Sequence, residues 1–310
     1  MRQRLYLYLT VQQLVFIIYF TLTTVIFFLA LNYGNEGVTV QLFGGGDDGL
    51  TYWAQAQNVA KGHSAVITSI YTVIIGNLIK ITGIENVYLI RIFNYLGFIL
   101  LVILATHLIS LIFRLEEKRI DPRVILNAKI IILLSFLFYA SLQMNLNLSI
   151  YRDIWIYMLY LLATILTIRI IFYRKRKLLY ILLLIPVLWL LGGFRRYALL
   201  AFMLSIIIYF TYKKIIRLKS PILVGVALLL IFGIYYTYFM DYIVPVVNMS
   251  LRSVLNYRLS SLTIYSGGSQ MWINLEQSNY IMFLINYIHS YVGNFIGPLP
   301  WHISSKATML

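Results

Sequence analysis

Two adjacent carboxylates, Asp47 and Asp48, follow the glycines at 44–46 and stand directly before a segment with helical spacing. The chain has only ten acidic residues, so a pair of them needs a physical reason. A carboxylate can take a proton from a hydroxyl group, which makes both residues candidate catalytic bases. The alternative is that either residue only caps the helix by accepting hydrogen bonds from its free amide groups.

Arginines stand in two later segments of the chain. One contains Arg152 followed by Asp153, and the other contains Arg195 followed by Arg196. A guanidinium binds phosphate through two parallel hydrogen bonds, so these arginines are candidate phosphate-binding residues. Together with a carboxylate base they indicate group transfer from a phosphorylated carrier. The alternatives are that Asp153 caps a helix or pairs with Arg152, and that the other arginines only reach lipid phosphates.

The elements that position these residues are membrane helices. The chain has 310 residues, of which 61% are hydrophobic and 11% charged, values outside the range of ordinary soluble domains. We expect an all-α, polytopic membrane protein with about seven or eight transmembrane helices, forming a single membrane-embedded domain over 1–310. The chain contains no cysteine, which excludes disulfide bonds and thiolate metal sites.

The positive charge follows the apolar pattern. The formal net charge is +15, but Lys and Arg stand in short clusters between apolar runs, as expected for cytoplasmic loops. We therefore predict a cell-membrane protein with a cytoplasmic N-terminus and no nucleic-acid partner. The first apolar run follows Arg2 and Arg4 and is predicted to be a retained anchor rather than a cleaved signal peptide.

The order of crossings follows from the basic clusters. The predicted spans are 13–32, 87–113, 124–148, 154–172, 178–193, 197–212 and 221–244, and 278–296 is either a further span or an outer-leaflet helix.

Two further helices are predicted to lie at the outer membrane surface rather than to cross it. Residues 49–61, ended by Gly62, have the spacing of a surface helix. Residues 64–82 are predicted to be a second surface helix, or one embedded only part way, on the outer side. The number of crossings between residue 63 and residue 114 must be odd, and the span 87–113 already supplies one. The outer loop is thus 33–86, and 245–277 forms a second outer segment. This topology places the acidic and arginine candidates together at the extracytoplasmic face.

These features together resemble the GT-C superfamily of membrane glycosyltransferases, which use polyprenyl-phosphate sugars, and family 39 in particular. The resemblance covers roughly the first 200 residues in order. The segments that carry it are the acidic pair with the helix that follows, the start of the second span and the second outer acidic motif: Asp47-Asp48-Gly49-Leu50-Thr51-Tyr52 to Ala60, Arg91-Ile92-Phe93-Asn94 and Arg152-Asp153.

The resemblance implies that a first-loop aspartate acts on the acceptor and that Asp153 is the second acidic residue. Asp48 is preferred over Asp47, because Tyr52 follows one helical turn later. The implied partners are a lipid-linked sugar donor, a saccharide or lipid acceptor and membrane lipids, in the synthesis of cell-envelope polysaccharide. Some members of the superfamily need a divalent metal. We predict no metal and no cofactor here, since a lone histidine such as His63 is more often structural.

Two other functions fit parts of the pattern. A polymerase or ligase of lipid-linked saccharide repeats would also use outer arginines to hold diphosphate. A transporter or flippase without chemistry would be expected to show paired repeats and interrupted helices with charges near the membrane midplane, and the sequence shows neither.

Overall fold

A computed structural model describes residues 2–32, 34–40, 48–64, 66–115, 120–173, 176–215, 221–244, 249–264 and 273–296. In these residues the fold is all-α, as predicted, with isolated bridges joining Thr39 to Ser149 and Val244 to Met249. The helices are α1 (Arg2–Asn32), α2 (Asp48–Ala60), α3 (Ile70–Thr82), α4 (Val87–Leu115), α5 (Pro122–Phe138), α6 (Ala140–Asn147), α7 (Asp153–Phe172), α8 (Lys177–Phe194), α9 (Arg196–Ile215), α10 (Pro221–Tyr238), α11 (Leu251–Ile264) and α12 (Tyr280–Ile296).

The described residues fall into two compact units. The first unit contains those up to Leu200, and the second contains those from Ala201 onward. The expectation of a single membrane-embedded domain over 1–310 stays a prediction.

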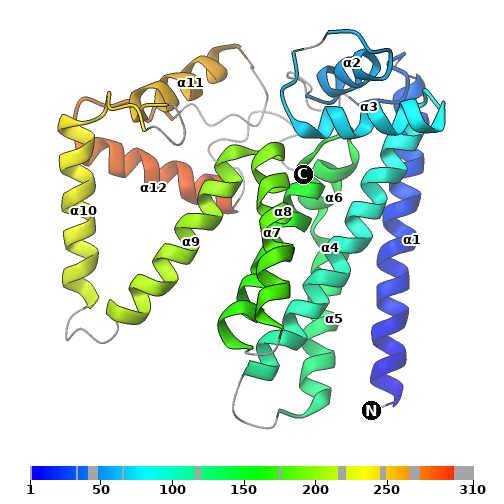
Figure 1. Cartoon of the computed structure of the whole chain (residues 1–310), viewed down its shortest axis with the longest axis horizontal. Helices are drawn as coiled ribbons and strands as arrows, with labels where there is room; N and C mark the ends of the chain where they lie inside the picture. Colours follow the sequence, from blue (N-terminus) through cyan, green and yellow to red (C-terminus); the bar gives the residue numbers. More distant parts are fainter. Residues whose placement is uncertain are drawn as a thin grey trace. The chain divides into compact units, whose positions relative to one another are not determined.

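Four helices of the first unit, α1, α4, α7 and α8, are long and apolar enough to cross a membrane. Shorter apolar stretches occur in α3, α9 and α10. These helices indicate a multi-pass membrane protein, as the composition predicted. In the first unit α1 packs on α5, and α4 packs on α5 and α7, which in turn packs on α8 (Figure 1).

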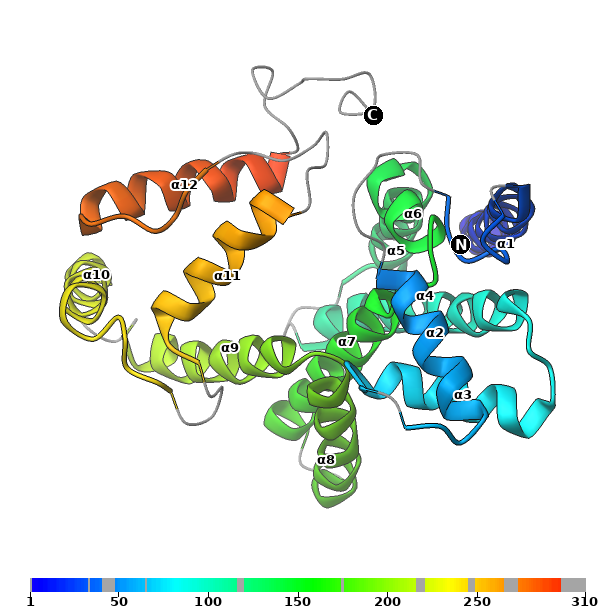
Figure 2. The same cartoon turned by 90° about the horizontal axis from the view of Figure 1, so that it is seen from above.

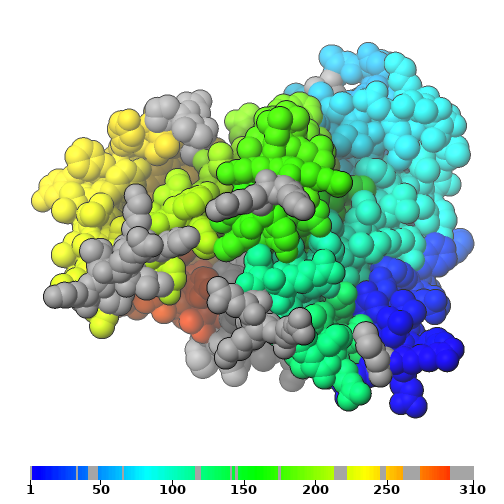
Figure 3. Space-filling model, turned by 60° about the horizontal axis from the view of Figure 1, so that its bottom comes forward, coloured from blue at the N-terminus to red at the C-terminus, as the bar shows by residue number. Residues whose placement is uncertain are grey.

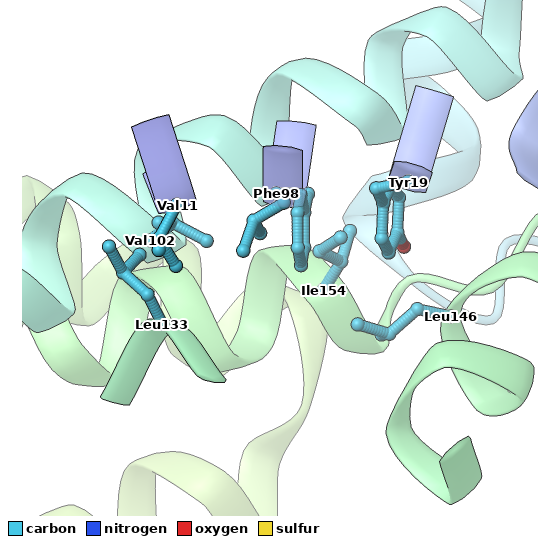
Figure 4. Close-up of a cluster of buried hydrophobic side chains, with 8 residues drawn as sticks. Val11, Tyr19, Phe98, Val102, Leu133, Leu146 and Ile154 are labelled. Atoms are coloured by element: carbon cyan, nitrogen blue, oxygen red, sulfur yellow. The ribbon is translucent and has the colours of Figure 1, made fainter. Parts of the chain in front are cut away.

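The core of this bundle is a cluster of buried side chains from α1, α4, α5, α6 and α7 (Figure 4). Tyr19 stacks on Phe98 with ring centroids 3.6 Å apart, and both are almost fully buried. Gly97 lets α7 approach α4, since an added Cβ would lie 3.1 Å from the Trp155 ring. Lipid tails are as apolar as these side chains, so close packing rather than exclusion of water holds the membrane helices together.

The predicted span 124–148 is wrong as one continuous helix. The helix breaks at Tyr139 into α5 and α6. The Gln143 side-chain amide donates to the Phe136 carbonyl across this break. Polar side chains of α6 thus bond to backbone carbonyls of this region. Asn147 is one of them, and its side chain donates to the Gln143 carbonyl at 2.9 Å.

The short helices α2 and α3 lie across the end of the bundle where α1 ends and α4 begins (Figure 1, Figure 2). Both helices exist as predicted, and their position at the membrane surface stays a prediction. Gly62, with φ +73°, follows α2 in the left-handed conformation that favours glycine. The helix is also tied to the preceding loop, where the Trp53 indole donates to Glu36 at 2.6 Å.

α3 is shorter than the predicted 64–82, because Ser69 caps its start by accepting from the Tyr71 amide at 3.3 Å. Gly76 allows close contact with α2: an added Cβ would lie 2.7 Å from the Val59 side chain and 2.8 Å from the Ala56 carbonyl. The α2–α3 pair is thus packed backbone against backbone.

The second unit contains α10, α11, α12 and most of α9. Its core is a cluster of buried residues from α10, the turn after α10, α11, α12 and the segment before α12: Tyr236, Met240, Leu255, Ile273, Leu275 and Phe283. α11 lies inside the predicted polar segment 245–277, where the sequence analysis predicted no helix. The predicted segment 278–296 is α12, which has 17 residues and is not among the long apolar helices.

Candidate active site

Asp48 is the first residue of α2, and its side chain is held by Tyr52 one turn later. The Tyr52 hydroxyl donates to Asp48 Oδ2 at 3.2 Å, and Tyr52 is only 4% exposed. Burial raises the pKa of the Tyr52 phenol well above its ordinary value, and the Asp48 carboxylate adds to this shift while Arg152 opposes it. The phenol therefore stays protonated and donates to the exposed Asp48 carboxylate. Asp47 lies outside the described residues.

Arg152 joins α2 to the start of α7. Its guanidinium lies 5.2 Å from the centroid of the Tyr52 ring, within the range of a cation–π contact. Tyr52 thus touches a candidate base through its hydroxyl group and a candidate phosphate-binding arginine through its ring face. The sequence analysis noticed Tyr52 only as support for Asp48.

Asp153 pairs with Arg195, which stands between α8 and α9. Arg195 Nη1 donates to Asp153 Oδ1 at 2.6 Å, and the two side chains are 31% and 21% exposed. The alternative considered from the sequence, a pair with Arg152, is not the ion pair observed. Asp153 also lies in the first turn of α7, where a negative charge is favoured by the helix dipole.

The Arg195 guanidinium is only partly satisfied by this ion pair. It lies over the Tyr197 ring at 4.6 Å from the centroid. Its Nε is buried and has no hydrogen-bond acceptor among the described residues. A buried donor left unpaired costs about 1 to 3 kcal/mol, so an anionic ligand that reached it would gain a contact the protein itself does not supply.

A pocket of about 520 Å³ contains all three predicted phosphate-binding arginines, Arg152, Arg195 and Arg196. The remaining lining comes from the segment before α3 with the start of that helix, from the end of α8 and from the start of α9. These two segments are joined by the Ser69 hydroxyl, which donates to the Phe194 carbonyl at 3.2 Å. The carboxylates of Asp48 and Asp153 are outside the lining but connect to it, through Tyr52 with Arg152 and through Arg195.

Behind the site, Asn94 connects three elements. Its Oδ1 accepts from the Tyr71 hydroxyl at 3.1 Å and from the Trp155 indole at 3.0 Å, while its Nδ2 donates to the Tyr151 carbonyl at 3.0 Å. Asn94 therefore fixes α3 and the start of α7 against α4. The sequence analysis quoted this residue only as part of the resemblance.

Arg91, one turn before Asn94, is 3% exposed and was also missed as a structural residue. It donates to the carbonyls of Gly37, Val38 and Asn147 at 2.9, 2.9 and 2.7 Å. An arginine inside an apolar run is itself a signal for a buried polar partner, and Arg91 with Asn94 three residues later marks one polar face of α4.

No group of three or more histidine, aspartate or glutamate side chains placed to hold a metal ion occurs among the described residues. The expectation of a reaction without metal stays a prediction. What the described residues supply is an exposed carboxylate linked through Tyr52 and Arg152 to an arginine-lined pocket.

No protein-family model, curated protein or solved structure matches the chain.

Proposed function

We propose that this protein is a membrane glycosyltransferase that moves a sugar from a polyprenyl-phosphate carrier to an acceptor at the extracytoplasmic face. One observation carries the proposal: Arg152, Arg195 and Arg196 line one pocket, and Tyr52 links Arg152 to Asp48. A cluster of guanidiniums next to an exposed carboxylate suits the leaving group and the nucleophile of a single transfer step.

In the proposed step Asp48 accepts the proton of an acceptor hydroxyl group. The acceptor oxygen forms a bond to C1 of the sugar as the bond between C1 and the phosphate oxygen breaks. The electron pair of that bond stays with the polyprenyl phosphate, whose added negative charge the arginines stabilise. Asp153 keeps Arg195 in position rather than reacting itself.

A lipid-borne donor is favoured by the position of the pocket. The pocket lies at one end of the long apolar helices, beside α3 and the α8–α9 turn. The Lys and Arg residues of α1, α4, α5, α7 and α8 stand mainly at the other end, which the positive-inside rule assigns to the cytoplasm. Soluble activated sugars are not expected on the opposite side, so the sugar would arrive on a lipid.

The direct test uses purified full-length protein in lipid nanodiscs with polyprenyl-phosphate monosaccharides carrying a radiolabelled sugar. Release of free polyprenyl phosphate and labelled product should occur with the wild type. Asp48→Asn should lower the rate by about 100-fold or more, since a positioned base typically contributes that much. The matched control is Glu85→Gln, which removes an exposed carboxylate paired with Lys61 at 3.1 Å and should leave the rate unchanged.

Transfer retained in both Asp47→Asn and Asp48→Asn would remove the proposal. Product length separates the related alternative, because a polymerase or ligase would transfer an oligosaccharide block from its carrier. Sidedness is tested by a cysteine introduced at Asn58 on α2 of the naturally cysteine-free chain, which an impermeant thiol reagent should label from outside intact cells.

A further inference from the structure

A second polar pocket, of about 390 Å³, lies at the end of the first unit's bundle opposite Asp153. Four basic side chains from three helices line it: His107 and Arg114 of α4, Lys129 of α5 and Arg169 of α7. Tyr173 and Tyr180 complete the polar lining with Ser110. None of the described lining residues carries a carboxylate, so the pocket is a concentration of positive charge.

The cations are held in place by uncharged groups. Arg169 Nη2 lies 2.8 Å from His107 Nε2, and because a guanidinium can only donate, the imidazole nitrogen accepts. Arg169 also lies over the Tyr180 ring at 5.3 Å and donates to its hydroxyl at 3.4 Å. Lys129 lies over the Tyr8 ring at 5.4 Å. Arg169 and Lys129 are therefore held by uncharged partners, which leave their positive charge unneutralised.

An apolar groove adjoins this pocket and shares three of its residues, Ser110, Arg114 and Lys129. The groove has a volume of about 560 Å³, and its other lining residues come from the start of α1 and the start of α5, including Leu5, Ile125 and Leu126. Figure 3 turns this end of the first unit forward, where the start of α1 lies beside α5. A cationic pocket that shares part of its wall with an apolar groove matches a molecule with an anionic head and a hydrocarbon tail.

We propose that this pair of cavities binds a phosphate-bearing lipid, with its phosphate among Arg114, Lys129 and Arg169 and an acyl or prenyl chain in the adjoining groove. Basic pockets between membrane helices are suited to anionic headgroups, because the phosphate gains charge-assisted hydrogen bonds where water is scarce. The apolar groove favours a lipid over a free phosphate ion, since inorganic phosphate could use only the cationic pocket. This site is separate from the arginine pocket near Asp153 and does not depend on the proposed transferase activity.

The test is equilibrium binding by calorimetry, with the full-length protein in a neutral detergent and three probes: dioctanoyl phosphatidic acid, dioctanoyl phosphatidylcholine and inorganic phosphate. Phosphatidic acid should bind at least about tenfold more tightly than either other probe. Lys129→Gln and Arg169→Gln should each weaken phosphatidic acid binding about tenfold, as expected for loss of a charge-assisted hydrogen bond. Lys177→Gln is the matched control, because Lys177 is exposed near this end but outside both linings, and it should bind like the wild type.

A second variant addresses the apolar groove without removing a charge. Ile125→Gln should weaken binding of phosphatidic acid and leave the affinity for inorganic phosphate unchanged. Three results would overturn the proposal: inorganic phosphate binding as tightly as phosphatidic acid, phosphatidylcholine binding as tightly, or Lys177→Gln weakening binding as much as Lys129→Gln. The first result would mean that the pocket binds a soluble anion. The second would mean that the protein binds lipids without preference for the headgroup. The third would mean that diffuse surface charge, rather than this pocket, attracts the lipid.

Discussion

The end of the first unit that carries Asp48 and Asp153 is called the site end. There Arg195 lies 2.6 Å from the Asp153 carboxylate. Arg152 lies over the ring of Tyr52, whose hydroxyl group donates to the Asp48 carboxylate. At the opposite end, here the basic end, Arg169 instead contacts an imidazole and a phenol. The two ends are separated by the length of α4, whose 29 residues extend about 43 Å.

Under the two proposals, the difference lets one residue type serve two tasks. An arginine paired with a carboxylate keeps its own charge, but its direction is fixed and the pair as a whole is neutral, which suits the placing of a leaving-group phosphate. An arginine fixed by neutral groups keeps its full charge, which suits capture of an anion. The following variants test this distinction, from the largest expected effect to the smallest.

Arg91→Met should give the largest loss of stability. The buried guanidinium at the site end donates to three carbonyls, and without it these acceptors stay buried and lose their charged donor. We expect a loss of about 3 kcal/mol or more, seen as a lower midpoint of thermal unfolding in detergent. Arg123→Met, at the exposed start of α5, is the control and should change stability by less than about 0.5 kcal/mol. Equal losses would mean that the Arg91 contacts are not special to the site end.

Gly76→Ala should separate α2 from α3, which cover only the site end. The new Cβ would meet Val59 at 2.7 Å and the Ala56 carbonyl at 2.8 Å, so the two helices must shift at a cost of about 1 to 3 kcal/mol. Hydrogen exchange of the α2 amides should become faster while that of α4 stays the same. Gly225→Ala in α10 is the matched control, since nothing lies within 4 Å of its added Cβ, and it should stabilise its helix by up to about 1 kcal/mol. A faster exchange in α4 as well would mean that the bundle, not the α2–α3 contact, had been disturbed.

Asp153→Asn should lower stability by about 1 kcal/mol, because the amide oxygen still accepts from Arg195 but no longer carries a charge. The ion pair is partly exposed, so the loss should shrink in about 1 M salt. Glu85→Gln breaks the more exposed pair with Lys61 and should cost no more than a few tenths of a kcal/mol. A loss that salt leaves unchanged would indicate that packing, rather than charge, joins Asp153 to Arg195.

Tyr52→Phe should have its clearest effect on the pH dependence of stability. The pKa of Tyr52 is raised in the folded protein, so the folded state favours the protonated phenol. The stability that this preference contributes is fully present below a pH of about 10, the pKa of tyrosine in the unfolded chain. It is lost as the pH rises further, because only the unfolded chain releases the proton there. The difference in unfolding midpoint between wild type and variant should therefore stay constant up to about pH 9 and then fall. A constant difference up to pH 11 would contradict the assigned shift.

The sequence was sufficient to predict the helical membrane class, most helix positions and the gathering of charged candidates. Helix period and apolar length are local properties, and they located α1, α4, α7 and α8. The basic clusters are also local, and they assigned Asp153, Arg195 and Arg196 to one end, where the structure brings them together.

Pairing was decided only by the tertiary structure. Asp153 is next to Arg152 in the chain but binds Arg195, because the turn between α8 and α9 approaches the start of α7 in space. The end of α6, after the break at Tyr139, is likewise held by a residue far away in the chain, because Arg91 of α4 donates to the Asn147 carbonyl. Local spacing determines which face of a helix a charge occupies, whereas the partner it meets depends on how separate helices pack, which no single segment encodes.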